Sequence, residues 1–273
     1  MKRRFDEPTV RIQRDLARSA AEGLGMRTSL GRCGRGQWSR SGVSRKEQTR
    51  TRAAMAYPEP VVVEPRKAHT ASVVWLHGLG DSGHGWASIS AQVQMPWVRY
   101  VFPTAPNRPI TINQGLSMPG WFDLADLGDN FVDDKQGLME SVRFVQDIVE
   151  QEVSKGIPRE RIVVGGFSQG GAVALQTLRS FPVGGVVALS SWLPLVGEKP
   201  YAISENRKAP ILFCHGDNDE VVHFHVGEGS AEKLQADGLK VDFKAFPGMA
   251  HEACLEEIVE IKKFLMHALP DLE

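Results

Sequence analysis

The apolar positions of this chain fall into short runs that alternate with longer segments of helical period. Short apolar runs that end in turn residues are typical of buried strands. Six such runs lie at 61–65, 71–78, 98–103, 161–166, 185–192 and 209–217. A seventh run, at 240–246, alternates apolar and polar residues, which predicts a strand with one more exposed face.

Between these runs the apolar spacing changes to three and four residues, which is one face of a helix. The clearest case is 135–155, and Gly156 follows it as a stop signal. Further helices are predicted at 169–180, 226–237 and 251–269. Because strands and helices alternate, we predict an α/β domain with a mostly parallel central sheet and helices on both faces.

The first part of the chain has a different composition. Residues 1–52 hold 14 Lys and Arg against 5 Asp and Glu, a net charge of +9, whereas the remainder holds 18 against 28, a net charge of −10. This segment is rich in Arg, Ser and Gly and lacks apolar periodicity, so it buries too little surface to offset its ordering entropy. We predict a disordered basic leader over 1–56 and one folded domain over 57–273.

Three interpretations of the leader stay open. Its Arg and Ser content fits an organelle transit peptide, although four acidic residues within its first 22 weigh against that. Interspersed charges weigh against a tail for nucleic acid or anionic membranes. The third interpretation is a non-essential extension before a working protein that starts near Met55. No apolar run suits a bilayer span or a secretory signal. We therefore predict the cytoplasm, with a plastid or mitochondrion as the alternative.

The cysteines and glycines exclude several classes of site. Cys33, Cys214 and Cys254 are widely spaced and form no C-x-x-C pair, which argues against a disulfide framework or a zinc site. The glycine-rich stretch WLHGLGDSGHGW at 75–86 lacks both phosphate-loop patterns. We predict no metal, no organic cofactor and no nucleic-acid partner.

Ser168 lies in the frame GFSQG, a G-x-S-x-G match that about one chain in ten of this length contains by chance. A predicted strand precedes this serine and a predicted helix follows it, as a nucleophile elbow requires. Gly166 and Gly170 leave room for the sharp turn, and the helix N-terminus favours developing negative charge. The context predicts that Ser168 is a nucleophile.

A serine nucleophile needs a base and an acid that orients the base. His251 follows the last predicted strand on a glycine-containing loop, where hydrolases with this elbow carry their histidine. The pair His223 and His225 is a weak signal for a metal site, since no third ligand accompanies it. The acid should follow an earlier strand end, and Asp217 and Asp219 both do so. Position alone leaves the two open.

Oxyanion donors complete such a site. One is expected from the backbone N–H directly after the nucleophile, which belongs to Gln169. The other comes from a loop after an early strand, here the stretch HGLG at 77–80, which can turn a backbone N–H into the site. For Gln169 we expect the backbone N–H to matter more than the side-chain amide.

Six separated motifs resemble the acyl-protein thioesterases, the lysophospholipase/carboxylesterase family of α/β-hydrolases. They are VVWLHGLGDSGHGW, MPGWFD, GIPRERIVVGGFSQGGAVAL, LSSWLPL, CHGDNDEVV and GMAHEAC, in the family's order from about residue 61 to the C-terminus. The resemblance implies a single-domain α/β-hydrolase fold with a minimal lid. It also implies hydrolysis of long-chain acyl thioesters of S-acylated proteins, and of lysophospholipids and small esters, with transient contact to a membrane surface.

The resemblance also assigns residues. It places the nucleophile at Ser168, the base at His251 and the acid at Asp219 rather than Asp217. It places the oxyanion donors at the backbone N–H groups of Leu79 and Gln169. Four residues are expected near the acyl channel, with a plain core role equally open for the tryptophans: Trp86, Trp121, Trp192 and Leu193.

The chain departs from the family pattern in three places. Glu220 and His223 stand where the family usually has prolines, so we expect a less rigid loop around Asp219. The segment 124–136 differs from the animal members, which leaves the acyl-chain preference open. The N-terminal cysteine that some members acylate is replaced by Lys2, so recruitment by that route is not expected.

Two rival functions remain at this stage. A general short-chain carboxylesterase would use the same three residues. A ligand receptor on a hydrolase scaffold would lack one of them, and all three are present here.

Overall fold

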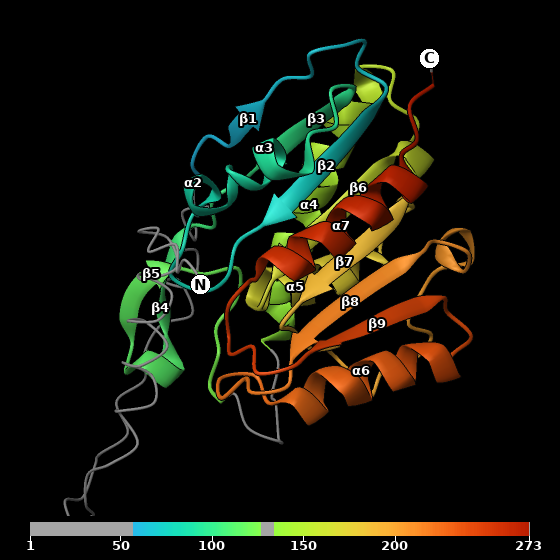
Figure 1. Ribbon diagram of the computed structural model, residues 1–273. Coiled ribbons are helices and arrows are strands. Elements are labelled where there is room, and N and C mark those ends of the chain that lie inside the picture. The colour runs from blue at the N-terminus through green and yellow to red at the C-terminus, as the bar shows by residue number, and fades with distance from the viewer. Residues whose placement is uncertain (1–56, 127–133, 273) are drawn as a thin grey trace, which may run out of the picture.

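The computed structural model of the protein describes residues 57–126 and 134–272, and its centre is one seven-stranded sheet (Figure 1). The predicted leader and most of the segment 124–136 lie outside the described residues. The strand order is β1-β3-β2-β6-β7-β8-β9, and every neighbouring pair is parallel except β1 with β3. The strands are β1 (Val61–Val63), β2 (Ala71–Leu76), β3 (Val98–Phe102), β6 (Ile162–Phe167), β7 (Gly185–Leu189), β8 (Ile211–Gly216) and β9 (Val241–Phe246).

Helices cover both faces of this sheet, and Figure 1 shows α7 crossing the face nearest the viewer. One apolar layer packs α4, α5 and α6 against the sheet, and the other packs α2, α3 and α7. Strand β2 serves both, since Val74 and Leu76 belong to the first layer while Val73 and Trp75 belong to the second. The helices are α2 (Gly83–Trp86), α3 (Ile89–Val93), α4 (Lys135–Ser154), α5 (Gln169–Thr177), α6 (Phe224–Ala236) and α7 (Leu255–Ala268).

All seven predicted strands and all four predicted helices are present, and the α/β fold class is confirmed. The sequence patterns missed α2 and α3, which are too short to show a helical period. They also missed a two-stranded hairpin formed by β4 (Asn107–Ile110) and β5 (Leu116–Pro119). Pro109 and Pro119 lie in these strands, and proline within an apolar run argues against a strand.

The last helix begins four residues later than the sequence predicts. Cys254 has an extended backbone, with φ −120° and ψ 167°, and caps the helix by accepting a hydrogen bond from the Glu257 N–H on its sulfur. His251 therefore lies in the loop between β9 and α7 rather than in the first turn of the helix.

Parallel strands bring the predicted site residues to one edge of the sheet. Strands β2, β6, β8 and β9 run in the same direction, so their carboxyl ends meet there. His77 follows β2, Ser168 follows β6, Asp219 lies just beyond β8 and His251 just beyond β9. The fold therefore places the residues of four distant sequence segments at a common edge.

Candidate active site

Ser168 occupies a strained turn between β6 and α5. Its φ is 52° and its ψ is −120°, a conformation that L-residues rarely adopt. Three hydrogen bonds hold the turn: the Ser168 N–H donates to Leu189 O at 2.8 Å, and the Ser168 carbonyl accepts from Ser191 Oγ at 2.8 Å and Ala172 N at 3.1 Å. The strand-to-helix geometry is that of a nucleophile elbow.

The glycines around Ser168 allow close backbone contacts. A Cβ on Gly166 would lie 2.5 Å from the carbonyl carbon of Gly170, and a Cβ on Gly170 would lie 2.4 Å from Leu76 O. A Cβ on Gly171 would lie 2.8 Å from Ser191 Cβ, which follows β7. Glycine is needed at these positions because a side chain at Gly166 would collide with the start of α5, and side chains at Gly170 and Gly171 would push the elbow away from the segments after β2 and β7.

The structure brings His251 to Asp219. His251 Nδ1 lies 2.7 Å from Asp219 Oδ2. A carboxylate only accepts hydrogen bonds, so Nδ1 carries a proton and Nε2 is left to accept one. The Asp219 side chain is fully buried, and its Oδ1 accepts the N–H groups of Val221 and Val222 at 2.9 Å each. The Asp219 carboxylate is thus held on both of its oxygens.

Asp217 has a different partner. Its Oδ1 accepts the N–H of Gly248 at 2.6 Å, in the turn after β9. Gly216 brings the two loops together, because a Cβ there would lie 2.1 Å from Met249 O. Asp217 therefore ties the loop after β8 to the loop after β9, while Asp219 contacts the histidine.

His251 also packs beside the elbow, since its ring centroid lies 4.7 Å from that of Phe167, the residue before Ser168. Within residues 57–126 and 134–272, no hydrogen bond joins Ser168 to His251. Such contacts often reach hydrogen-bonding distance only when substrate is bound. The described geometry thus pairs Asp219 with His251 and places the His251 ring against Phe167, the residue before Ser168.

Two backbone N–H groups near Ser168 have no acceptor among the described residues. One belongs to Gln169, the first residue of α5, where helix geometry leaves N–H groups unpaired. The other belongs to Leu79, in the loop after β2. A Cβ on the neighbouring Gly78 would lie 3.5 Å from Ser168 Cβ, so this loop lies against the serine. Unpaired N–H groups near a serine are the kind of donor that an oxyanion hole uses.

The four residues expected near an acyl channel are all buried. Trp121 and Trp192 are 0% and 1% exposed, and Leu193 and Trp86 are 5% and 6% exposed. Trp121 packs against Tyr57, His77 and Phe144, which is a core environment. Their role at a channel stays a prediction.

His215, which no sequence motif indicated, is buried and follows the apolar residues of β8. Its Nε2 donates to Val222 O at 2.8 Å and lies 3.4 Å from Asp219 Oδ2. Burial lowers its pKa, so the ring is neutral near pH 7. A Cβ on Gly227 would lie 2.1 Å from His215 Nδ1. The only sequence signal was a histidine inside an otherwise apolar strand.

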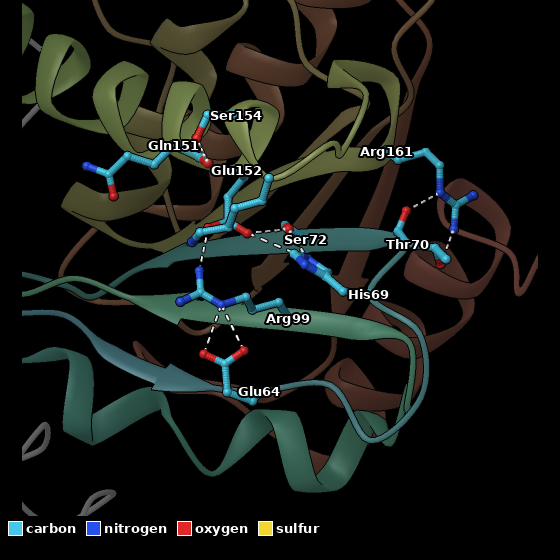
Figure 2. A network of polar contacts seen from close by, with 10 residues as sticks. Glu64, His69, Thr70, Ser72, Arg99, Gln151, Glu152, Ser154 and Arg161 are labelled. Carbon is cyan, nitrogen blue, oxygen red and sulfur yellow. Dashed lines mark hydrogen bonds and ion pairs between the residues drawn. The ribbon is translucent and has the colours of Figure 1, made fainter.

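A second cluster of serine, histidine and carboxylate lies at the opposite edge of the sheet (Figure 2). Ser72 Oγ donates its proton to Glu152 Oε2 at 2.7 Å. His69 Nε2 lies 2.9 Å from Ser72 Oγ and must therefore be the donor in that second hydrogen bond. Ser72 is 0% exposed. Although burial acts to raise the pKa of Glu152, hydrogen bonds from Lys155 and Ser72 and the charge of Arg99 lower it. The cluster is a structural ion network, not a second nucleophile.

Comparison with known proteins identifies the family of this chain. The profile of the phospholipase/carboxylesterase family matches residues 57–269. Acyl-protein thioesterase 1 of Cryptococcus neoformans is 40% identical over 228 residues, which cover 76% of this chain and 96% of that protein. The chain belongs to the phospholipase/carboxylesterase family.

Other members of the family agree in sequence and fold. Acyl-protein thioesterase 1 of Neurospora crassa is 38% identical over 232 residues, covering 80% of this chain and 95% of that protein. The crystal structure of Zea mays acyl-protein thioesterase 2 superposes with a TM-score of 0.71 at 32% identity, covering 78% of this chain and all of that one. The predicted α/β-hydrolase fold and the predicted enzyme class, a hydrolase of ester and thioester bonds, are therefore confirmed.

The loop around Asp219 departs from the family pattern at Glu220 and His223, and hydrogen bonds hold it instead. The two N–H bonds to Asp219 Oδ1 form a local cap that holds this loop without the prolines that Glu220 and His223 replace.

Among the described residues, no cluster of His, Cys, Asp and Glu suits a metal ion. No helix in the described ranges is long and apolar enough to cross a membrane.

Proposed function

We propose that the protein hydrolyses long-chain acyl thioesters of S-acylated proteins through Ser168, His251 and Asp219. One observation carries the proposal: the hydrogen bond of 2.7 Å between Asp219 and His251, whose imidazole packs against Phe167, the residue before the elbow serine. The names of its relatives in two fungi and in maize support the thioester as substrate.

In the acylation step, Ser168 Oγ attacks the thioester carbonyl carbon while its proton passes to His251 Nε2. The imidazolium that forms faces the buried carboxylate of Asp219. Negative charge develops on the carbonyl oxygen, and the N–H groups of Leu79 and Gln169 stabilise it by about 2.7–4 kcal/mol each. The carbon–sulfur bond then breaks, and the thiol leaves with the proton from His251.

In the deacylation step, water replaces the thiol. The water oxygen attacks the acyl carbonyl carbon while His251 Nε2 takes a proton from the water. The N–H groups of Leu79 and Gln169 again bind the oxyanion. The bond between the carbonyl carbon and Ser168 Oγ breaks, and Oγ recovers the proton. The products are a free fatty acid and the original enzyme, so the reaction consumes only water.

The finer properties of the substrate are part of the same proposal. Lysophospholipids and other carboxylic esters would react at the same residues, because oxygen esters pass through the same tetrahedral intermediate. A substrate with a long acyl chain lies at a membrane surface, so we propose transient contact with that surface. The cytoplasm is the proposed compartment, where S-acylated proteins present their thioesters.

Turnover of three substrates tests the substrate class. A palmitoylated peptide, lysophosphatidylcholine and a short-chain ester are compared by kcat/KM. The proposal predicts the highest value for the palmitoylated peptide. Activity confined to the short ester would favour a general carboxylesterase, and turnover of none would favour a ligand receptor.

Labelling with a fluorophosphonate tests the nucleophile. The wild-type chain should take one label per molecule, and Ser168→Ala should take none. Ser191→Ala is a matched control, because Ser191 lies beside the elbow but donates its hydroxyl to the Ser168 carbonyl. It should still be labelled to one equivalent. Stoichiometric labelling of Ser168→Ala would overturn the assignment.

A further inference from the structure

The side-chain amide of Gln169 makes two hydrogen bonds to the backbone of a distant segment, in addition to the role expected of its N–H. Its Oε1 accepts the backbone N–H of Trp121 at 2.8 Å, and its Nε2 donates to the carbonyl of Phe122 at 2.7 Å. The Gln169 side chain is fully buried. Gln169 supplies one proposed oxyanion donor through its backbone. Its side chain also binds the segment at Trp121 and Phe122, which lies almost 50 residues earlier in the sequence.

Trp121 continues this chain of contacts to the loop after β2. Its indole N–H donates to the carbonyl of His77 at 2.8 Å, and the two ring centroids lie 5.0 Å apart. Both side chains are 0% exposed. Breaking a buried hydrogen bond leaves its partner without water to replace it, so the contact constrains both residues strongly.

The His77 ring binds the peptide group between Gly78 and Leu79. The N–H of Ala105 donates to His77 Nε2 at 3.0 Å, so this nitrogen is unprotonated. The proton is on Nδ1, which donates to the carbonyl of Gly78 at 2.6 Å. Burial lowers the pKa of His77, which keeps this neutral tautomer near pH 7.

The Gly78 carbonyl and the Leu79 N–H belong to one peptide group. A trans peptide is planar, so its N–H points opposite to its C=O. The Gly78 carbonyl accepts from His77 Nδ1 and also from the Asp81 N–H at 3.2 Å, so the Leu79 N–H is directed away from the His77 ring. Gly78 lies against Ser168, as its close approach to Ser168 Cβ shows. Rotation of this peptide would remove the donor from the site.

We propose that Trp121 and His77 are positioning residues that fix the two oxyanion donors, the N–H groups of Leu79 and Gln169, in position relative to each other. A continuous set of hydrogen bonds runs from the Gln169 side chain through Trp121 and His77 to the peptide that carries the Leu79 N–H. It joins the elbow after β6 to the loop after β2, which are separate in sequence. The proposal rests on the proposed function, because it assigns Leu79 and Gln169 as donors to the transition state.

The variant Trp121→Phe tests the indole contact. Phenylalanine keeps an aromatic ring between Tyr57 and Phe144 but has no N–H for the His77 carbonyl. Misplacement of a reacting group by about 1 Å costs on the order of a hundredfold in rate. We expect kcat to fall about tenfold to a hundredfold, with KM within about twofold. The affinity for a trifluoromethyl ketone, which mimics the tetrahedral intermediate, should fall by the same factor as kcat/KM.

Trp75→Phe is the matched control. Trp75 is also a buried tryptophan, but its indole nitrogen has no hydrogen-bond partner in the described part of the chain, so the substitution removes aromatic volume without removing a hydrogen bond. We expect kcat within about twofold of the wild type. An equal loss of kcat in both variants would overturn the proposal, because the effect would then come from core packing.

Two substitutions of His77 separate its two contacts. Asparagine places an amide near the position of Nδ1 and keeps a donor for Gly78, whereas glutamine places one near Nε2 and keeps an acceptor for Ala105. The proposal predicts that His77→Asn retains most of kcat and that His77→Gln loses about tenfold or more. The reverse order would assign His77 to loop anchoring and overturn its role at the oxyanion.

Failure of this inference is distinguishable from failure of the proposed function. Wild-type turnover of a palmitoylated peptide and loss of label in Ser168→Ala test the function alone. The variants Trp121→Phe and His77→Gln test the inference. Their fluorophosphonate labelling should still reach one equivalent, because the nucleophile is intact, but more slowly, because the oxyanion donors are displaced. An active wild type with Trp121→Phe and His77→Gln at full kcat would leave the function standing and refute the inference.

Discussion

Asp219 and His251 form a hydrogen bond of 2.7 Å between Oδ2 and Nδ1, while Asp217, two residues earlier, binds the N–H of Gly248 instead. The two carboxylates thus have separate tasks on one loop. Asp219 contacts the proposed base, and Asp217 joins the loop after β8 to the turn after β9.

This division predicts unequal effects of the two isosteric substitutions. Asp219→Asn should lower kcat by about 10⁴, because an amide favours the wrong tautomer of His251 and offers no charge to the imidazolium. Asp217→Asn should keep kcat within about threefold, since an amide oxygen still accepts from Gly248. Steady-state kinetics on an acyl thioester measure both. Comparable losses in the two variants would contradict the assignment of the acid.

The elbow predicts a steric requirement at Gly170. A Cβ there would meet the Leu76 carbonyl at 2.4 Å and the His77 carbonyl at 2.6 Å, and backbone cannot yield as a side chain can. Gly170→Ala should lower the free energy of unfolding by at least about 2 kcal/mol. Urea denaturation monitored by circular dichroism measures it.

Gly229→Ala is the control for that substitution. Gly229 lies inside α6, and the nearest atom to its Cβ position is Lys233 Nζ at 3.5 Å, so the methyl group has room. Alanine in a helix interior is favoured over glycine by about 0.8–1.0 kcal/mol, so stability should rise. A destabilised Gly229→Ala variant, or an unaffected Gly170→Ala variant, would refute the steric argument.

Glu257 predicts a pH dependence of stability. The residue is 0% exposed, and neither carboxyl oxygen has a well-aligned hydrogen-bond partner among the described residues. Burial raises its pKa to about 8 from an ordinary value of 4.5, although the backbone of Cys254 acts in the opposite direction. Between these values the unfolded chain has lost the proton that the folded chain retains. The unfolded state therefore binds fewer protons, and the free energy of unfolding falls as the pH rises through this window.

Glu257→Gln should remove that slope, because glutamine has similar shape and does not ionise. Its stability advantage over the wild type should grow by up to about 1.4 kcal/mol per pH unit from about pH 4.5 to about pH 8, then level off. Burial also raises the pKa of the Cys214 and Cys254 thiols, so neither titrates in this window. Parallel stability curves for the two proteins would contradict the prediction.

The position of His223 predicts that the family proline can be restored there. Its φ is −56°, within the range that proline adopts, and its N–H donates no hydrogen bond within the described residues. His223→Pro should raise stability by about 0.4–1 kcal/mol, since it restricts the unfolded chain. Thermal unfolding measures the change, and kcat should be unchanged.

Val222→Pro is the matched control, one residue earlier. The Val222 N–H donates to Asp219 Oδ1 at 2.9 Å, so proline would remove part of the cap that holds the acid. Stability and kcat should both fall. Equal effects at 222 and 223 would show that the loop responds to rigidity alone and not to the contact with Asp219.

The sequence by itself determined the elements and the candidates for the site. The periods of its apolar residues identified seven strands and four helices, because burial on a sheet or helix face leaves a repeating pattern. The flanking glycines and the strand-to-helix setting identified Ser168. The chain order of the motifs led to His251 and to a choice between Asp217 and Asp219.

Tertiary structure decided which of these residues meet and how the site is held. Loops after β8 and β9 are 30 residues apart in sequence, and only parallel pairing brings Asp219 to His251. The hydrogen bonds among Gln169, Trp121 and His77 left no sequence signal, because side-chain contacts between distant segments follow no period. The buried carboxyl of Glu257 likewise left no sequence signal, because its environment exists only once α7 packs against the sheet.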